Sequence, residues 1–525
     1  MFLYRLSIFT LFLFLFSLSP GYSQTNEAGG SNGKVLRVEL ETKQDSEPYT
    51  FIPFGNKGVV VFYESVVTTE DRDHTIWVFQ FYDVNLRQVW IQELPVLKGL
   101  EFHKSDIDFN EGLLYLMFYN DKKSYSGDEF QIVLIPGNEG TITAQTGKLA
   151  DKAAMTHFEV FGNLALIGAH TQKKNAHFYI YNMEEKSQQK IDLNLQGLSF
   201  LMDIYVDTVY DRINIIFKDY IEKQGEQIFF RSYDYDWNSL STIEINNDER
   251  DYLINGADFV PVNENESIII GTYKDNQKGK YEVTTESDIN FEATGFYIAK
   301  LLGDTNEFIK YHDFSKFNSF YKNLSVSDLS RIRKKDKNSE GITIDYNLLV
   351  HNTIPLNDTF VFIAEAYYPE YHTITRMMYD WYGRPIPSYY NVFDGYRYTS
   401  VFIAGFDKNG NLLWDNGLEL WDILTFKLEK RVNVVFDKEE TVIAYSNNGE
   451  VTYKVISGSK DVFGVDNIPI ESRYPRDRLI SESSSNMVYW YKNYFLTYGY
   501  QRIKNNTLTD QNRRYVFYFN KIAFN

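Results

Sequence analysis

Short, almost continuously apolar stretches recur along the chain, most of them about 50 residues apart. Residues that are apolar at successive positions are typical of strands buried on both faces. The sequence therefore predicts eight buried strands, one in each repeat. They lie at residues 58–64, 112–119, 163–170, 212–219, 267–273, 359–367, 441–446 and 494–500.

A hairpin pattern follows several of these strands. In residues 401–420, an aromatic and aliphatic strand ends at Phe406-Asp407, an Asn-Gly turn follows, and Trp414 stands seven positions after the aspartate. Asn-Gly favours a type I′ turn, in which both central residues take positive φ. Residues 76–90 repeat the spacing, with Trp90 in the place of Trp414, and looser copies lie at 177–191, 227–243 and 295–309. We predict that Trp90 and Trp414 are structural residues that dock neighbouring repeats.

A repeat of this length is typical of β-propeller blades. We predict an all-β chain with a single propeller over residues 34–525, made of eight four-stranded blades, with seven as the alternative. The last repeat is one strand short, and residues 34–41 alternate apolar and polar side chains as a strand does. We expect this N-terminal strand to join the C-terminal blade, which would close the ring and remove an open edge. Insertions are expected at 274–294, 313–341 and 369–400.

An outer-membrane β-barrel is the structural alternative. Barrel strands alternate lipid-facing apolar residues with polar residues that face the lumen. The eight apolar stretches do not alternate in this way, so the pattern favours the propeller and leaves the barrel as a further alternative.

The N-terminal segment predicts that the chain is exported. Residues 1–23 have the pattern of a secretory signal peptide, with Arg5 before an apolar stretch and Gly21-Tyr22-Ser23 at the cleavage site. Residues 24–33 read as a flexible leader, and no later stretch is apolar enough to span a membrane. The net charge of −18 argues against nucleic acid as a partner. We expect export to the periplasm, the outer membrane or the cell exterior.

The chain has no cysteine and 17% aromatic residues. A disulfide framework, thiol catalysis and Cys-ligated metals are therefore excluded. The richness in Phe, Tyr, Asn and Lys resembles exported proteins of Bacteroidota.

The hairpins, Phe406–Trp414 above all, resemble the repeats of quinoprotein-like eight-bladed propellers, in which Asp, a Gly-containing turn and a docking Trp follow one another. That family includes quinone-dependent dehydrogenases and non-enzymatic scaffolds such as the propeller of the outer-membrane protein assembly machinery. The enzymes typically carry a calcium-binding acidic set and a vicinal disulfide. Because this chain lacks cysteine, the resemblance implies the scaffold branch.

Polar residues open the innermost strand of several predicted blades. They could ring one mouth of the central channel, where carboxylates and imidazoles could bind a small ligand or a cation such as calcium. Alternatively, each could bond the backbone of the neighbouring blade and hold the blades in register. No other cofactor is expected. These candidates are Asp106, His157, Asp203, Asp258, His351 and Asn433.

The insertion 369–400 is rich in aromatic residues, Met and Arg, which are enriched at protein interfaces. Either it binds a protein partner or it is a long hairpin that covers its aromatics by folding back on the propeller. Another insertion, 313–341, carries a short helix candidate and a basic cluster at 331–337. The partner-binding candidates are Tyr371, Arg376, Tyr379, Trp381, Tyr382, Arg384, Tyr389, Tyr390, Phe393, Tyr396 and Arg397.

Motifs for catalysis are absent from the sequence: it has no HExxH, no GxSxG and no phosphate-binding Gly loop. The function that we predict is therefore non-catalytic, a protein-binding or scaffolding propeller of the bacterial envelope that accompanies an outer-membrane assembly or secretion complex. The alternative is an enzyme or a protein that binds a glycan or small ligand at the channel mouth.

Overall fold

The computed structural model describes residues 36–523, apart from 45, 67–71, 109–110, 121–128, 138–139, 151, 172–174, 196, 222–224, 246–251, 276–291, 320–345, 380, 438–439 and 510–511. The predicted signal peptide and leader, the basic cluster and most of the insertions 274–294 and 313–341 lie outside the described residues. The fold is a single all-β propeller of four-stranded blades. This confirms the propeller architecture that the apolar pattern of the sequence favoured.

The strands pair into eight antiparallel sheets, which we number 1 to 8 along the chain. Sheets 1 to 4 are regular four-stranded meanders. Sheet 1 holds β2 (Thr50–Phe54), β3 (Gly58–Glu64), β4 (His74–Tyr82) and β5 (Gln88–Leu97), and sheet 2 holds β6 (Glu101–Asp108), β7 (Leu113–Tyr119), β8 (Glu129–Ile135) and β9 (Thr143–Lys148). Sheet 3 holds β10 (Ala153–Phe161), β11 (Leu164–Thr171), β12 (Ala176–Asn182) and β13 (Ser187–Ile191), and sheet 4 holds β14 (Leu198–Asp207), β15 (Arg212–Ile221), β16 (Gly225–Tyr233) and β17 (Ser239–Ile245).

Sheets 5 and 6 carry extra short strands, and sheets 7 and 8 are again four-stranded. Sheet 5 holds β18 (Tyr252–Ile254), β19 (Asp258–Asn263), β20 (Glu266–Asp275), β22 (Gly295–Leu302) and β23 (Thr305–Asp313). Sheet 6 holds β21 (Glu292–Ala293), β24 (Tyr346–Val350), β25 (Ile354–Leu356), β26 (Thr359–Tyr379), β27 (Pro385–Asp407), β28 (Leu412–Glu419) and β29 (Leu424–Thr425). Sheet 7 holds β30 (Val432–Asp437), β31 (Glu440–Asn447), β32 (Glu450–Ser457) and β33 (Lys460–Pro469), and sheet 8 holds β34 (Arg478–Tyr491), β35 (Tyr494–Lys504), β36 (Arg513–Ala523) and β1 (Arg37–Glu41).

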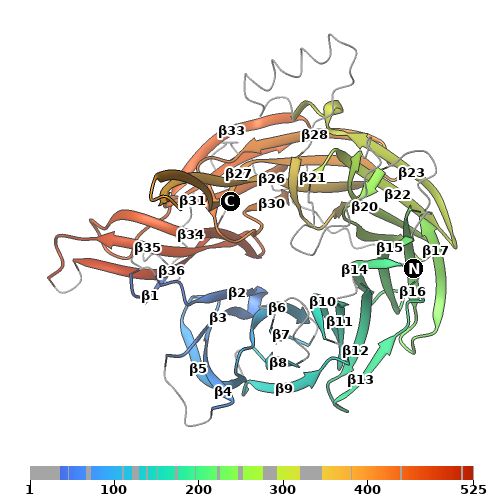
Figure 1. Ribbon diagram of the computed structural model, residues 1–525, viewed down its shortest axis with the longest axis horizontal. Helices are drawn as coiled ribbons and strands as arrows, with labels where there is room; N and C mark the ends of the chain where they lie inside the picture. Colours follow the sequence, from blue (N-terminus) through green and yellow to red (C-terminus); the bar gives the residue numbers. More distant parts are fainter. Residues whose placement is uncertain are drawn as a thin grey trace, which may run out of the picture.

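The sheets are arranged around a central axis, with β6, β10 and β14 toward the centre and β9, β13 and β17 at the rim (Figure 1). Two 3-10 turns, η1 (Gly55–Lys57) and η3 (Phe314–Lys316), lie between strands. The propeller is counted as seven blades, which is the alternative in the sequence prediction. Its strands nevertheless pair into eight separate sheets. We retain eight sheets, because among the described residues each sheet shares a buried apolar cluster with the next, including sheet 8 with sheet 1.

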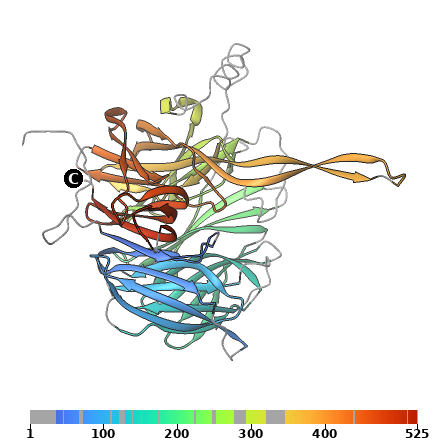
Figure 2. The same ribbon diagram turned by 90° about the vertical axis from the view of Figure 1, so that its left-hand side faces the viewer.

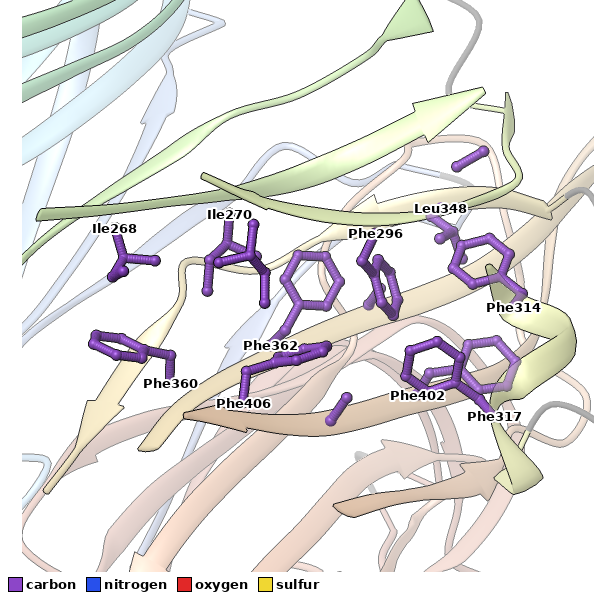
Figure 3. Close-up of a cluster of buried hydrophobic side chains, with 14 of the residues drawn as sticks. Ile268, Ile270, Phe296, Phe314, Phe317, Leu348, Phe360, Phe362, Phe402 and Phe406 are labelled. Carbon is purple, nitrogen blue, oxygen red and sulfur yellow. The ribbon is translucent and has the colours of Figure 1, made fainter. Parts of the chain in front are cut away.

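The predicted apolar strands are the second strands of the eight sheets: β3, β7, β11, β15, β20, β26, β31 and β35. Both of their faces pack against neighbouring sheets, which explains why they do not alternate. The cluster between sheets 5 and 6 shows the arrangement (Figure 3): Ile268 and Phe296 meet Phe362 and Phe402, and Phe314 of η3 covers one end. This cluster holds the inner halves of β26 and β27.

The N-terminal strand closes the ring as predicted. β1 pairs antiparallel with β36, with Arg37 opposite Asn520 and Glu41 opposite Val516. Sheet 8 thereby gains the outer strand that the C-terminal repeat lacks. The indole Nε1 of Trp490 on β34 also donates to the carbonyl of Gly58 in sheet 1, at 2.9 Å. Closure is therefore made by backbone pairing within sheet 8 and by packing against sheet 1.

The aspartate before the outer strand closes a turn in sheets 1, 4 and 6. The Oδ1 atom of Asp407 accepts from the backbone N–H of Asn409 (2.9 Å) and of Asn411 (2.8 Å). Asp83 and Asp234 make the same pair of bonds in their sheets. The sequence predicted a type I′ turn at Asn409-Gly410, but only Gly410 has positive φ there. The aspartate supplies the acceptor that stabilises this longer turn.

No helix among the described residues is long and apolar enough to cross a membrane.

Candidate functional site

The hairpin of β26 and β27 extends far beyond the propeller. These strands have 21 and 23 residues, whereas the second strands of the other sheets have 7 to 11. Their inner halves pack in sheet 6, and their outer halves leave the ring as an isolated two-stranded ribbon (Figure 2). We call the outer pairs, from Tyr371 opposite Phe393 to Tyr379 opposite Pro385, together with the turn between them, the hairpin arm. Nine residues at about 3.3 Å each make the arm about 30 Å long.

Aromatic and apolar side chains of the arm face solvent. Trp381 at the tip is 96% exposed, and Tyr382, Tyr379 and Tyr389 are 80%, 72% and 68% exposed. The arm therefore does not cover its aromatics by folding back on the propeller, which was one of the two readings of the insertion 369–400. The other exposed apolar residues of the arm are Tyr371, Ile374, Met377, Met378, Ile386, Tyr390 and Val392.

Both faces of the arm are partly apolar. On one face Ile374 lies opposite Tyr390 and Met378 opposite Ile386, and the hydroxyl of Tyr390 donates to the sulfur of Met378 at 3.3 Å. The other face carries Tyr371, Met377, Tyr379 and Tyr389 among threonines. Arg376 is exposed between Ile374 and Met378, and Arg384 lies over the ring of Tyr382 at the tip, 5.8 Å from its centroid. A flat partner would cover only one of these faces.

The base of the arm is held by a different set of contacts. The guanidinium of Arg397 pairs with the carboxylate of Glu370 and lies 3.7 Å from that of Asp422. The ring of Phe393 packs edge-on against Tyr396, with centroids 5.1 Å apart. The half-buried candidates Phe393, Tyr396 and Arg397 thus fix the base. The exposed candidates of the arm are Tyr371, Arg376, Tyr379, Trp381, Tyr382, Arg384, Tyr389 and Tyr390.

The six channel candidates lie near the ring centre, mostly on the innermost strands. Five of them bond the backbone of the next sheet, as in the register-holding alternative. The three carboxylates accept from backbone N–H groups: Asp106 from Val160 (2.7 Å), Asp203 from Phe259 (3.1 Å) and Asp258 from Thr353. The Nε2 atom of His157 lies 3.3 Å from the carbonyl oxygen of Met202. The side chain of Asn433 donates to the carbonyl of Met487 (2.6 Å) and accepts from the N–H of Tyr489 (2.8 Å).

His351 has a different partner, because its Nε2 lies 2.6 Å from Oε1 of Glu365 within sheet 6. Glu365 is fully buried and also accepts from the backbone N–H groups of Arg431 and Val432 in sheet 7, at 2.9 Å each. Sequence reasoning missed Glu365, since it stands inside an apolar stretch. A lone carboxylate in such a stretch was the available signal, because buried charges require partners.

β-Bulges aim several of these side chains at the next sheet. The pairing of β6, β10 and β14 shifts just before Lys104, His157 and Asp203, and a bulge redirects the side chain that follows it. Lys104 donates to the carbonyl of Thr156 in sheet 3. The same three positions thus link sheets 2 to 5 in sequence, and the sequence pattern did not identify Lys104.

Carboxyl groups near the ring centre hold their protons unusually tightly. Burial raises the pKa of Asp203 to about 8, and the Asp258 carboxylate adds to the effect against the opposing Phe259 N–H. Burial, with Asp106 nearby, likewise raises the pKa of Glu159 to about 7, although Lys104 opposes it. Within the described part of the chain, no three His, Asp or Glu side chains gather closely enough to hold a metal ion.

We expect Asp203→Asn to change how stability depends on pH. The carboxyl pKa is about 8 in the folded state and about 3.9 in the unfolded chain, so between these values the folded state binds more protons. Stability of the native protein should therefore fall as pH rises from 4 to 8. The variant keeps an acceptor for Phe259 N–H and lacks this loss, so above pH 8 it should be more stable by several kcal/mol, since each pKa unit corresponds to about 1.4 kcal/mol.

Equilibrium unfolding in urea from pH 4 to 9 measures this difference. Asp236→Asn, at an exposed turn position, is the control, and its curve should stay parallel to that of the native protein. A difference between Asp203→Asn and the native protein that does not vary with pH would contradict the prediction.

The two predicted docking tryptophans both contact the next sheet. Trp90 donates from Nε1 to the carbonyl of Gly137 in sheet 2 at 3.0 Å and stacks on Phe81. Trp414 covers Gly405 in its own sheet and lies near Gly458 of sheet 7, where an added Cβ would be 3.6 Å from its ring. Both tryptophans therefore lie at blade junctions.

Comparisons with known proteins give remote likenesses to solved structures. No family model and no curated protein matches it. Among solved structures it is similar to the polysaccharide lyase Uly1 (9% identity, 93% of this chain and 92% of that chain, TM-score 0.37). It is also similar to the dihydro-heme d1 dehydrogenase NirN in complex with DHE (11% identity, 93% and 78%, TM-score 0.41). A third is the β-propeller domain of the Trilobed protease from Pyrococcus furiosus (7% identity, 80% and 93%, TM-score 0.32). Likenesses this remote carry no argument about activity.

Proposed function

We propose that this chain is a non-catalytic, protein-binding propeller of the bacterial cell envelope, and that the hairpin arm is its principal contact with a partner. The observation that carries the proposal is the exposure of large apolar side chains on both faces and at the tip of the arm. Contiguous apolar surface of this kind marks interaction sites, and aromatic, Met and Arg residues dominate interface energetics.

The rest of the molecule supports a scaffolding role. The ring is rigid by construction, because each sheet is packed against the next and the polar groups of the inner strands are engaged with neighbouring backbone. A rigid body that projects one long ribbon can reach a partner about 30 Å away. The predicted signal peptide and the lack of cysteine support an envelope location, with an outer-membrane assembly or secretion complex as the partner.

Shortening the arm tests this proposal. Replacing residues 373–391 by Asn-Gly joins His372 to Val392, which already lie opposite each other, by a two-residue hairpin turn. We expect the shortened protein to keep its melting temperature, because the removed side chains have no place in the core, and to lose partner capture from native envelope extracts at least tenfold.

Two point variants distinguish binding by the arm from nonspecific binding through any exposed aromatic side chain. Trp381→Ser at the tip should weaken capture, whereas Tyr489→Ser, an exposed aromatic on β34, should leave it unchanged. Unchanged capture by the shortened protein would show that the arm is not the contact.

A further inference from the structure

Among the described residues, no strand pairs with the outer edge of β26 along the arm. In an antiparallel pair, alternate residues direct their N–H and C=O groups toward the partner strand or away from it. The carbonyl of Ile363 accepts from His351 N at 2.9 Å, on the side away from β27. The register shifts in this pair come from extra residues on β27, Thr399 and Asp394, so the alternation along β26 is unbroken. The odd-numbered residues of β26 from Tyr371 to Tyr379 therefore direct their backbone groups away from β27.

Proline residues reduce the capacity of the opposite edge of the ribbon to pair with another strand. The N–H of Tyr398 donates away from β26 to the carbonyl of Ile423 at 3.1 Å, so near Tyr398 the even-numbered residues of β27 direct their backbone groups outward. Beyond the extra residue Asp394, the odd-numbered residues of β27 direct their backbone groups outward instead. Pro385 and Pro387 fall at such outward positions, where their missing N–H groups remove two donors. The β27 edge thus resists strand addition, whereas the β26 edge keeps every donor from Tyr371 to Tyr379.

Closer to the propeller, the same edge of β26 already pairs with strands. β24 pairs with it at Ala364–Tyr367, and β25 pairs with it at Thr359–Val361. Beyond Tyr367 no described strand other than β27 pairs with β26. An added strand would therefore continue sheet 6 outward in the line of β24.

The arm also gives such a strand side-chain contacts on both faces. Ile374 and Met378 lie on one face of β26, and Tyr371 and Met377 lie on the other. Aromatic and aliphatic side chains are favourable neighbours across strand pairs, and an isolated two-stranded ribbon is marginally stable in water until a third strand or a covering surface is added.

We propose that the partner of the arm donates an extended strand that pairs with the β26 edge from Tyr371 to Tyr379. This inference rests on the proposed function and specifies its mode of binding, strand addition. The recognised segment is about nine residues long. It has apolar side chains on both faces of the added strand and carries a carboxylate near Arg376. It has no proline at the positions that donate to β26.

Proline substitutions in one cross-strand pair test the proposal. Thr375 and Tyr389 lie directly opposite each other, and both direct their backbone groups outward, one at each edge. Neither Thr375→Pro nor Tyr389→Pro removes a hydrogen bond between β26 and β27. With the full chain as bait in native envelope extracts, we expect Thr375→Pro to lose capture at least tenfold and Tyr389→Pro to stay within twofold of the native protein.

Hydrogen exchange on the isolated complex supplies the site-resolved measurement. We expect the amides of Thr373, Thr375 and Met377 to become protected on binding, and that of Asn391 on the other edge to keep exchanging. Equal capture by the two proline variants would overturn strand addition and leave the arm as a contact through its faces. Protection of the β26 amides already in the free protein, or a complex that contains only copies of this chain, would overturn the proposed occupant. Capture that survives shortening of the arm would instead overturn the proposed function itself.

Discussion

Replacing Arg514 by alanine is expected to lower the free energy of unfolding by about 3–5 kcal/mol. The Arg514 side chain is 6% exposed and joins two carboxylates that are almost completely buried, at 2.9 Å to Oε2 of Glu39 and 2.5 Å to Oδ2 of Asp477. Removing the guanidinium would leave the Asp477 carboxylate buried without this cation, whereas Glu39 would keep Arg37. An uncompensated buried charge costs far more than an exposed pair contributes.

Because of where this network lies, its loss should mainly weaken the closure of the ring. Glu39 belongs to β1, Arg514 to β36, and Asp477 to the segment before β34, so the three side chains fasten the N-terminal strand to the last sheet. Arg37 extends the network by bonding Glu39 at 2.7 Å and Gln501 at 2.7 Å. We therefore expect the β1 amides of the Arg514→Ala variant to exchange with solvent before those of the other sheets.

The network also gives this effect a pH dependence. Burial alone would raise the pKa of Asp477, but hydrogen bonds from Arg514 and Asn505 hold that pKa below its ordinary value. A carboxyl with a lowered folded-state pKa stabilises the fold above its unfolded pKa and loses that contribution as pH falls through the folded value. The difference between the native protein and Arg514→Ala should thus shrink in acid.

Urea unfolding of the native protein and the variant measures the loss, and Arg513→Ala is the matched control. Arg513 precedes Arg514 on the same strand but is exposed, so its removal should cost well under 1 kcal/mol. Similar losses in both variants would show that Glu39 and Asp477 find other partners or water.

The continuous apolar runs were sufficient to predict the second strand of every sheet, and the alternation in residues 34–41 predicted the closing strand. These elements depend on burial of whole strands, which leaves a signal in each run of residues such as 58–64. The aspartate at the end of the third strand was noticed as a repeat, but its role in closing the turn through Asn409 and Asn411 required the backbone geometry. Local patterns therefore predicted elements, and the hydrogen bonds within turns had to be observed.

The candidate sites were less predictable because they depend on packing between sheets. The composition of residues 369–400 indicated an interaction surface, but it left open whether its aromatics face solvent or the propeller. Near the ring centre, side chains such as Lys104 are aimed by bulges, and a single extra residue reverses the face that each later residue takes. Glu365 shows the same limit, since its acceptor role depends on the backbone of Arg431, 66 residues later, at the entrance to sheet 7.

Replacing Glu365 by alanine is expected to destabilise the fold by about 3–4 kcal/mol, because two buried backbone N–H groups lose their acceptor at about 1–3 kcal/mol each. Those groups belong to Arg431, which directly precedes β30 of sheet 7, and to Val432, which begins it. Glu365 itself lies on β26, six residues before the arm begins at Tyr371. The substitution would therefore loosen sheet 7 from the strand that carries the arm.

Hydrogen exchange separates this local effect from a general loss of stability. In Glu365→Ala the amides of Arg431 and Val432 should exchange faster than the amides of the rest of β30 under native conditions, because these two lose their acceptor. Glu365→Gln keeps the side-chain volume and one acceptor but turns an amide group toward the donors, so it should recover only part of the loss. Glu419→Ala, an exposed glutamate on β28 of the same sheet, is the control for removing a charge. A Glu365→Ala variant as stable as Glu419→Ala would show that water can replace the carboxylate, and that the junction of sheets 6 and 7 is fixed by apolar packing alone.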